Sequence, residues 1–362
     1  MRYRLFFLLL FLMMGACVEP ESEQKLTLPS GLQVELTVDE EGSGVVNIKA
    51  TASLTNFYTI DYGDGSPVDR SVDGIFEHRY EATGTYLVKI NAHVTTFDFI
   101  SAEKTADISV NLLKIPSGGP VSPVSYPGKT LVWQEEFSGA SINTADWTYD
   151  IGTGNGGWGN NELQYYRTDN VSLMDGYLVI AAKKEPFLGR EYTSTRLKTQ
   201  GLRSFNYGRI DVRAAMPEGQ GLWPAIWMLG TNITSVGWPR CGEIDIAEMV
   251  GGQGREKTVL GTVHWDNNGT YASFGGTRTL SNGTLAKSFH VYSIEWTSQS
   301  IVWYIDDVQY HAIDINPAEL SEFKNSFFLI LNLAVGGNLP GNPDGSTIFP
   351  QYFIVDYIRY FK

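Results

Sequence analysis

The chain has 362 residues, of which 43% are hydrophobic and 19% are charged, so it is long enough for roughly two globular domains. A formal net charge of −13 and an isoelectric point of about 4.9 give a surface that repels polyanions. This charge argues against nucleic acid and strongly sulfated polymers as partners, and it leaves a neutral polymer compatible.

The first residues have the pattern of an export signal. Two arginines precede an apolar run over residues 5–14, and the small residues Gly15 and Ala16 then precede Cys17. This pattern predicts a signal peptide over residues 1–16, whose apolar run is too short to span a bilayer as a helix. The small pair before the cysteine resembles a bacterial lipobox, which implies that Cys17 becomes the lipidated first residue. Simple signal cleavage with an incidental Cys17 is the alternative.

An acidic, polar tether follows over residues 17–25, with Glu19, Glu21 and Glu23 close to the cysteine. We expect an outer-membrane lipoprotein of the cell envelope that faces the cell surface and contacts the membrane only through the lipid on Cys17. We also expect it to be monomeric.

Cys241 is the only other cysteine. With Cys17 acylated, no intrachain disulfide can form, so stability has to come from core burial. The acidic residues next to Cys241 disfavour its thiolate, so we interpret this cysteine as structural and not as a nucleophile.

Residues 26–114 contain short alternating segments at 33–38, 45–49 and 86–90, bounded by clusters of Gly, Asp and Ser. This period-two pattern predicts strands and a small β-sandwich. The segment Tyr62-Gly-Asp-Gly65, with the later motifs at 78–80 and 84–86, resembles a PKD-type immunoglobulin-like module. Its Asp64-Gly65 pair predicts a tight hairpin turn. The module is either a rigid spacer, which we favour, or a glycan-binding module whose aromatic platform would come from Phe57, Tyr58, Phe97 and Phe99.

Residues 115–128 are rich in Pro, Gly and Ser and are predicted to be a linker. The composition then changes, because all nine Trp residues lie at position 133 or beyond. Over residues 129–362, short strands alternate with Gly- and Asn-rich turns, and helical periodicity is nearly absent. The fold class is therefore predicted to be all-β, with a large jelly-roll sandwich as the second domain.

Three acidic residues in this domain stand close together in the sequence. On a regular strand, Glu243 and Asp245 face one side while Ile244 and Ile246 face the other, and Glu248 is out of phase by one residue. A β-bulge between Asp245 and Glu248 would return all three acids to one face. Mutual repulsion there raises at least one pKa, which suits a general acid beside an ionised nucleophile, as in retaining glycoside hydrolysis. A solvated strand edge and a calcium site are the structural alternatives.

Aromatic residues are predicted to border the same groove, where their rings can stack on the C–H faces of sugars. They are Trp223, Trp227, Trp238 and the pair His264-Trp265. For Trp147, Trp296 and Trp303 we favour a place in the core.

These motifs resemble glycoside hydrolase family 16, and specifically its laminarinase-like members with the bulged Glu-x-Asp-x-x-Glu motif. The resemblance runs through nearly the whole second domain and follows the family order at residues 133–137, 157–165, 208–213, 221–229, 242–248, 289–296, 331–337 and 355–359.

The resemblance implies that Glu243 is the nucleophile and Glu248 the acid/base, with Asp245 hydrogen-bonded to the nucleophile. His264 matches a family position near the acid/base, and its alternative is a satisfied core histidine. Further matches to groove positions are Asn161, Arg196, Trp223, Trp227, Trp238 and Asn332, of which Arg196 would donate a planar fork to sugar hydroxyls.

No cofactor is expected for the chemistry. Many family members hold a structural calcium ion far from the groove, and the matching residues here are Glu136, Gly176 and Asp356.

The sequence thus predicts an endo-β-glucanase acting on β-1,3-glucan such as laminarin, on mixed-linkage β-1,3/1,4-glucan, or on both. One alternative is a family 16 hydrolase of algal galactans such as agar or porphyran. Two others are a transglycosylase that uses the same intermediate and a non-catalytic glycan-binding protein on the same scaffold.

Overall fold

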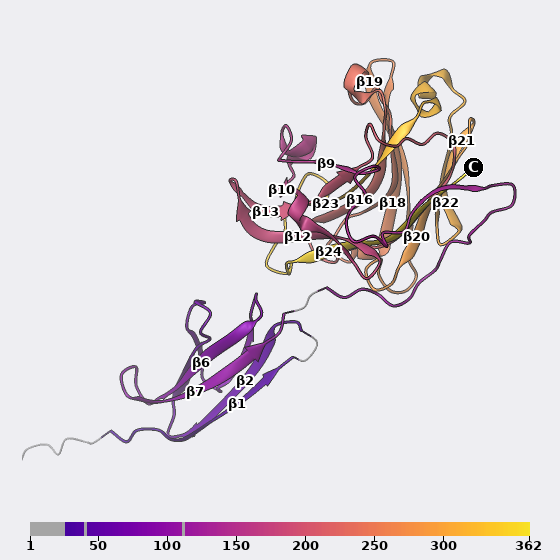
Figure 1. Cartoon of the computed structure of the whole chain (residues 1–362). Helices are drawn as coiled ribbons and strands as arrows, with labels where there is room; N and C mark the ends of the chain where they lie inside the picture. The colour runs from indigo at the N-terminus through magenta and orange to yellow at the C-terminus, as the bar shows by residue number, and fades with distance from the viewer. Residues whose placement is uncertain (1–25, 40–41, 111–112) are drawn as a thin grey trace, which may run out of the picture. The chain divides into compact units, whose positions relative to one another are not determined.

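The computed structural model describes residues 26–39, 42–110 and 113–362, and it divides into two compact units at residues 111–112 (Figure 1). The predicted signal peptide, Cys17 and the tether over residues 17–25 lie outside the described residues. Among the residues that are described, no helix is long and apolar enough to cross a membrane.

The first unit is a sandwich of two antiparallel sheets, as its alternating segments predict. The three-stranded sheet has the order β1-β2-β5, with bounds Ser30–Val38, Val45–Ser53 and Ile75–Arg79. The four-stranded sheet has the order β4-β3-β6-β7, with bounds Asp69–Ser71, Phe57–Asp61, Gly84–His93 and Phe99–Ile108. Alternate side chains of both sheets form the core, among them Val46, Ile48, Ile60, Val88 and Ile90.

The turn at Asp64-Gly65 is longer than predicted. β3 ends at Asp61 and β4 begins at Asp69, so the connection covers residues 62–68 in place of a two-residue hairpin turn. Gly65 has the positive φ expected for it, at 85°. The Asp64 carboxylate folds the loop back, because it accepts a hydrogen bond from the Ser66 amide at 3.0 Å and lies 2.7 Å from His78 Nε2.

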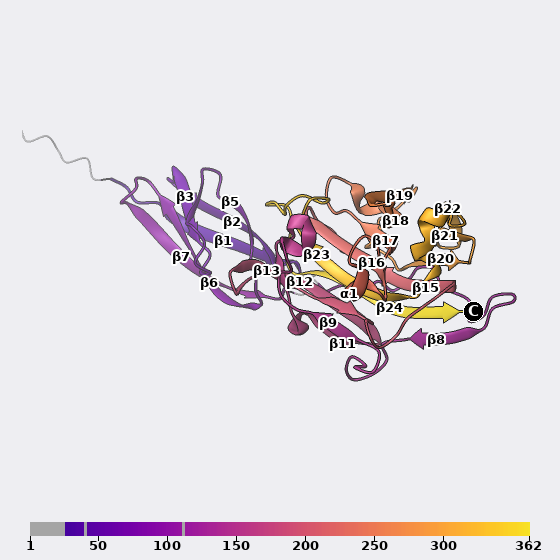
Figure 2. The ribbon, with the colours of Figure 1, turned by 90° about the horizontal axis from the view of Figure 1, so that it is seen from above.

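The second unit is a sandwich of a seven-stranded and a ten-stranded sheet, as the all-β jelly-roll prediction requires (Figure 2). The seven-stranded sheet has the order β19-β18-β17-β16-β23-β14-β9, with bounds Thr270–Thr279, Thr258–Asn267, Glu243–Met249, Leu222–Gly230, Phe327–Val335, Arg196–Lys198 and Thr148–Asp150.

The ten-stranded sheet has the order β10-β13-β12-β24-β15-β20-β21-β22, with bounds Gln164–Tyr166, Arg190–Ser194, Tyr177–Phe187, Gln351–Phe361, Gly208–Ala215, His290–Trp296, Ser300–Ile305 and Val308–Asp314. Off this path, β11 (Val171–Met174) pairs with β12, and β8 (Leu131–Glu135) pairs with β24. The described helical segments are short, and they comprise α1 (Ile233–Val236) and turns at Gly157–Asn161, Thr168–Asn170, Arg255–Lys257 and Ala318–Lys324.

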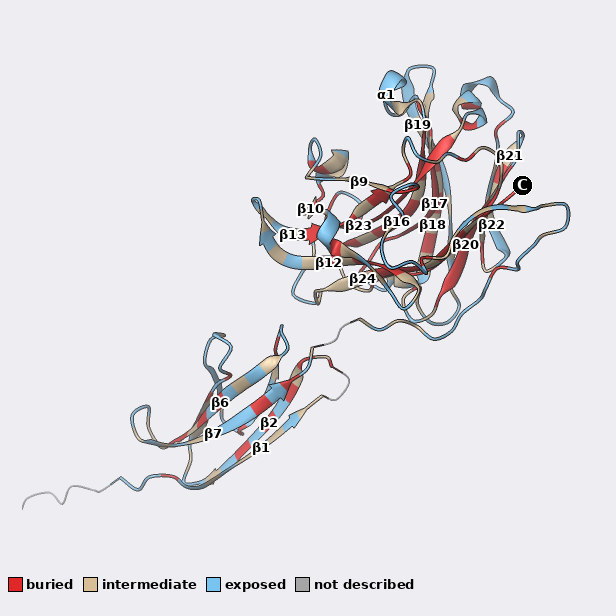
Figure 3. Ribbon diagram, in the orientation of Figure 1, coloured by how far each residue is buried: buried red, intermediate tan, exposed pale blue. Residues whose placement is uncertain are grey.

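The core of this unit lies between its two sheets, where buried residues line the facing strands (Figure 3). Trp147, Trp296 and Trp303 are each at most 1% exposed, so the prediction that these three belong to the core is confirmed. Trp265 also packs against this core, beside Phe323, and not into the groove as predicted. The reason is strand alternation, because a residue next to His264 points to the opposite face.

The predicted linker over residues 115–128 is packed onto the second unit. The Arg213 guanidinium donates to the carbonyl oxygens of Gly118 and Pro120 at 3.1 and 2.7 Å. Farther along the segment, the Tyr126 hydroxyl donates to Asp211 at 2.6 Å. A Pro- and Gly-rich segment exposes its carbonyl groups, and here the buried Arg213 side chain of β15 satisfies those of Gly118 and Pro120.

Candidate active site

The acidic residues of β17 share one face because the strand carries the predicted bulge. Asp245 pairs with Thr262 and Glu248 pairs with Leu260, so β17 has one more residue than β18 between these two pairs. Ile244 is fully buried in the core on the opposite face. The extra residue therefore returns Glu248 to the side of Glu243 and Asp245, as the phase of the sequence predicts.

A tryptophan indole donates a hydrogen bond to each of the two outer carboxylates. Trp238 Nε1 donates to Glu243 at 2.7 Å, and Trp223 Nε1 donates to Glu248 at 2.8 Å. These bonds fix the orientation of both carboxyl groups, and a bond to an ionised carboxylate is stronger than one between neutral groups.

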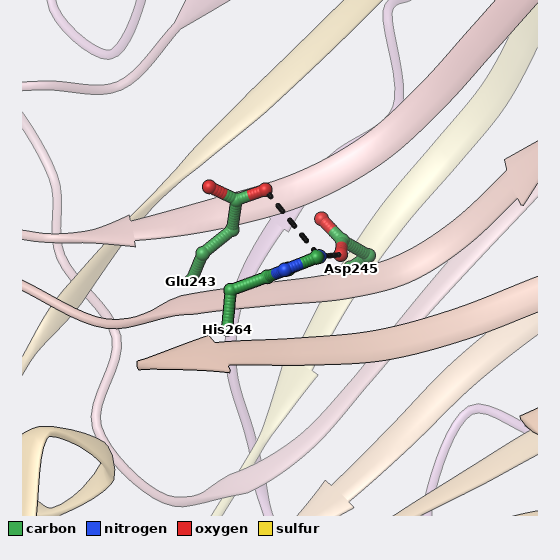
Figure 4. Close-up of side chains that lie close together, drawn as sticks. All are labelled: Glu243, Asp245 and His264. Atoms are coloured by element: carbon green, nitrogen blue, oxygen red, sulfur yellow. Dashed lines mark hydrogen bonds and ion pairs between the residues drawn. The ribbon is translucent and has the colours of Figure 1, made fainter. Parts of the chain in front are cut away.

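Asp245 lies between the two and contacts His264. The Nε2 atom of His264 lies 3.0 Å from Asp245 Oδ2 and 4.0 Å from Glu243 Oε1, and Figure 4 shows the three side chains pointing toward one another. On its other side, His264 Nδ1 lies 2.8 Å from the hydroxyl of Tyr271. Behind the strand, the Trp303 indole donates to the Asp245 carbonyl oxygen at 2.8 Å and ties the bulge to the core.

Burial raises the pKa of all three acids, and repulsion from a neighbouring acid adds to the rise at Glu243 and Asp245. Burial raises the pKa of Glu243 to about 8, and the charge of Asp245 adds to this rise. Burial, with the charge of Glu248, raises the pKa of Asp245 well above its usual range, and burial also raises the pKa of Glu248. The cluster therefore retains protons at neutral pH and can hold a carboxylic acid ready to protonate a leaving group.

The acids lie in a groove of about 720 Å³ whose walls combine aromatic rings with polar side chains. The lining includes the predicted residues Arg196, Trp223, Trp227, Trp238, His264 and Asn332 together with the three acids. Trp238 is 51% exposed and offers an open indole face at the rim. Such faces stack on sugar rings, while the acids and amides bind hydroxyls.

Arg196 is held on several sides. Its guanidinium carbon lies 4.8 Å from the ring centre of Trp158 and 4.6 Å from that of Trp227. Its Nε lies 3.0 Å from Asp150, a residue of the neighbouring strand β9. These contacts restrict its side chain and point to a fixed wall of the groove.

The side chain of Asn332 forms hydrogen bonds with other residues of the groove wall. Its Oδ1 accepts from Trp227 Nε1 at 2.7 Å, and its Nδ2 donates to the Tyr166 hydroxyl at 3.1 Å. The Tyr166 hydroxyl in turn donates to the buried Glu162 at 3.1 Å. Asn332 thus orients Trp227 and also lines the groove, and its contact with the substrate stays a prediction.

Asn161 is not among the lining residues, contrary to the prediction. Its side chain donates to Asn338 Oδ1 at 2.8 Å, on the exposed side of the loop, and its neighbours Asn160 and Glu162 line the groove. The loop takes left-handed φ values at Trp158 (57°) and Asn161 (57°), so strand alternation does not apply there.

The comparisons agree with this geometry. Residues 159–345 match the family model described as glycosyl hydrolases family 16. A β-glucanase from Rhodothermus marinus is 41% identical over 253 residues, which is 65% of this chain and 86% of that protein. The chain belongs to glycosyl hydrolase family 16.

Two further similarities extend the family assignment. The clotting factor G alpha subunit of Tachypleus tridentatus is 40% identical over 238 residues, which is 65% of this chain but 34% of that longer protein. The laminarinase catalytic domain from Thermotoga maritima matches with a TM-score of 0.60 and 43% identity, covering 65% of this chain and 98% of that one. The second unit of this chain is therefore a glycoside hydrolase domain, with Glu243, Asp245 and Glu248 at its acidic strand.

Two of the three residues predicted to hold calcium in this family 16 domain, Glu136 and Asp356, have arginine partners. Both oxygens of Glu136 accept from the Arg359 guanidinium, at 2.8 and 3.0 Å, and Asp356 forms an ion pair with Arg213. Gly176 has a φ of 84° in the turn between β11 and β12 and offers only backbone groups. Backbone carbonyl groups would supply some of the ligands of a calcium ion, so the calcium site stays a prediction.

Another group of side chains has the spacing of metal ligands. Ligand atoms of Glu243, Asp245 and His264 lie within 4.8 Å of one another, the one such group of three among the described residues. Two of these side chains also have other partners, because Glu243 accepts from Trp238 and His264 lies 2.8 Å from the Tyr271 hydroxyl.

Cys241 is fully buried beside the acidic strand. Burial raises the pKa of its thiol to about 11, and the charge of Glu243 adds to the rise. The thiol stays protonated at neutral pH, which agrees with its interpretation as a structural residue.

Several residues of the site were not named individually from the sequence, although three of them lie in the segment 157–165 that resembles the family. Trp158, Asn160, Glu162 and Tyr271 line the groove. The first three follow a run of glycines whose backbone directions cannot be anticipated from alternation. Tyr271 had a usable signal, because Asn268-Gly269 between alternating segments predicts a two-residue hairpin and thereby the register of Tyr271.

Proposed function

We propose that this chain is a retaining endo-β-glucanase that cleaves β-1,3-glucan, mixed-linkage β-1,3/1,4-glucan, or both. The observation that carries the proposal is the bulged strand β17, which presents the half-buried Glu243 and the buried Asp245 and Glu248 to an aromatic-lined groove. The β-glucanase and laminarinase relatives support the choice of substrate.

In the first step, Glu243 attacks the anomeric carbon of the sugar while Glu248 protonates the leaving oxygen. The attack requires the ionised form of Glu243. Burial raises the pKa of Glu243 to about 8, and the Trp238 indole opposes this rise because it donates to the carboxylate. In the second step, Glu248 removes a proton from water, which attacks the same carbon and releases Glu243. A retaining pair of this kind has carboxyl groups roughly 5–5.5 Å apart.

The groove favours a neutral chain over a sulfated galactan. Arg196 is the one arginine or lysine among its described lining residues, and Asp150 lies beside it. A sulfated substrate would need more unpaired cations, since each sulfate carries a full negative charge. A non-catalytic glycan-binding protein on this scaffold would be expected to lose at least one of the three acids, and all three are present.

Product analysis on laminarin, barley β-glucan, agarose and porphyran tests the proposal. We expect oligosaccharides from one or both glucans and none from the galactans, and we expect transfer products only at high concentrations of acceptor sugar. The control is Glu243→Gln, which keeps the shape of the site and removes the nucleophile. Release of oligosaccharides from agarose or porphyran alone, or full glucan hydrolysis by the variant, would overturn the proposal.

We also propose that Cys17 carries the lipid of an outer-membrane lipoprotein displayed at the cell surface, with the first unit as a spacer. The lipobox-like sequence supports the anchor. A Cys17→Ala variant should lose incorporation of labelled fatty acid and leave the membrane fraction, and protease accessibility on whole cells tests surface display. Unchanged labelling and fractionation of the variant would contradict the anchor.

The contacts around Phe57 support the role of spacer for the first unit. Phe57 lies between β4 and β6, with the Arg70 guanidinium carbon 4.0 Å from its ring centre and the His93 ring stacked at 4.5 Å. Tyr58 is 6% exposed. Of the four aromatic residues considered for a platform, only Phe97 and Phe99 are well exposed, at 89% and 40%.

A further inference from the structure

We infer that Tyr271 is a positioning residue of the active site, whose hydroxyl fixes the orientation and tautomer of His264 and through it the carboxylate of Asp245. The effect of Tyr271 on catalysis rests on the proposed function. It adds a residue of β19 to the site that β17 and β18 form.

The β18–β19 hairpin brings Tyr271 to this place. Asn267 pairs with Thr270, so Asn268 and Gly269 form a two-residue turn, and both have positive φ, at 54° and 87°. The register that follows pairs Asp266 with Tyr271. Since Ser273 pairs with His264, Tyr271 is the diagonal neighbour of His264 on the same face, within reach of a long side chain.

The contacts form a continuous chain from solvent to the acids. The Tyr271 hydroxyl lies 2.8 Å from His264 Nδ1, and His264 Nε2 lies 3.0 Å from Asp245 Oδ2. The rings of Tyr271 and His264 are nearly parallel, with centroids 5.8 Å apart and an interplanar angle of 15°. The histidine is thus held at both nitrogens and across its ring face.

The partners decide which nitrogen of the neutral ring carries the proton. Asp245 also hydrogen-bonds Glu243, and its Oδ2 is available to accept from Nε2–H. The bare Nδ1 then needs a donor, and Tyr271 O–H is the group in place to supply it. This arrangement holds the Asp245 carboxylate in its orientation toward the nucleophile. In other catalytic sites, too, the hydrogen-bond partner of one histidine nitrogen decides which nitrogen carries the proton.

Tyr271 also belongs to the rim of the groove. Its ring is 50% exposed and lies 5.3 Å from that of Trp238, whose indole binds Glu243. Replacing Tyr271 by Phe keeps this ring and removes the hydroxyl alone, so it separates positioning from sugar stacking.

The test measures kcat and KM of the full chain on laminarin or barley β-glucan for Tyr271→Phe. Loss of one positioning hydrogen bond predicts a fall in kcat of roughly 3- to 10-fold. KM should stay within about twofold, because the ring that faces the substrate remains. Tyr165→Phe is the matched control, since Tyr165 is outside the groove lining and should keep wild-type kcat and KM.

The nitrogen-15 signals of the His264 ring give a readout that does not depend on activity. In the substrate-free wild type we expect a protonated Nε2 and a hydrogen-bonded, unprotonated Nδ1, and in Tyr271→Phe we expect the Nδ1 signal to move toward that of an unbonded nitrogen. A protonated Nδ1 on a neutral wild-type ring, an unmoved Nδ1 signal in the variant, or an unchanged kcat would each overturn the inference. A wild type inactive on every glucan would refute the proposed function, while the ring signals would still decide the role of Tyr271.

Discussion

Because the acids of β17 have raised pKa values in the folded protein, we expect the free energy of unfolding to fall as the pH rises. Burial raises the pKa of Glu243 from 4.5 to about 8, so between these values the folded chain keeps a proton that the unfolded chain releases. The unfolded state then binds fewer protons, and the stability of the wild type falls as the pH rises through this window. The pKa values of Asp245 and Glu248 are raised as well and act in the same direction.

Replacing Glu243 by Gln removes one titrating group and keeps an acceptor for the Trp238 indole. At about 1.4 kcal/mol per pKa unit, the full shift sets a ceiling of roughly 4–5 kcal/mol at pH 8. Relaxation of the site and its high effective dielectric reduce this, so we expect the variant to be more stable by ~2–4 kcal/mol at pH 8 and by about 0 at pH 4.

Chemical denaturation followed by tryptophan fluorescence measures this difference in the second unit, because all nine Trp residues lie at position 133 or beyond. The control is Glu191→Gln, at an exposed position on β13. A stability gain that is the same at pH 4 and pH 8, or a loss at pH 8, would refute the reasoning, because only titration of Glu243 makes the gain depend on pH.

Three further outcomes are expected. Trp238→Phe keeps an aromatic rim but removes the donor to Glu243, so kcat on laminarin should fall by roughly 3- to 10-fold, and an unchanged kcat would show that this bond is not needed. If a structural calcium ion is bound at Glu136, Gly176 and Asp356, EDTA should lower the Tm of the chain and added calcium should restore it, whereas an unchanged Tm would contradict this site. Binding to insoluble β-glucan is compared in a Glu243→Gln background, which prevents hydrolysis. In that background the further change Phe97→Ala with Phe99→Ala should leave binding unchanged, and weaker binding would favour a glycan-binding first unit.

The arrangement of the acidic strand could be predicted in detail, because residues within the strand itself determine it. The apolar residues Ile244 and Ile246 fix the phase of β17, and the position of Glu248 then requires an extra residue. The core residues Trp147, Trp296 and Trp303 were also predictable.

What could not be predicted depends on partners distant in the sequence. The segment 115–128 has the composition of a flexible linker, and nothing within it indicates that Arg213 satisfies its carbonyl groups. Asn332 lines the groove, but nothing in its own segment of the sequence indicates that it bonds Trp227 and Tyr166. In the loop around Asn161, the backbone takes left-handed φ values. Side chains there do not alternate between two faces as they do on a strand, so the sequence does not show which of them point into the groove.

The central claim is that Glu243 forms a covalent bond to the sugar and that Glu248 supplies and removes the proton. The most direct measurement is the intact mass of a Glu248→Gln variant incubated with an activated β-laminaribioside, whose leaving group needs no acid. The account predicts that a glycosyl-enzyme accumulates and that peptide mapping places the sugar on Glu243, because the variant cannot activate water. The absence of an adduct despite release of the leaving group, or an adduct on another residue, would contradict it.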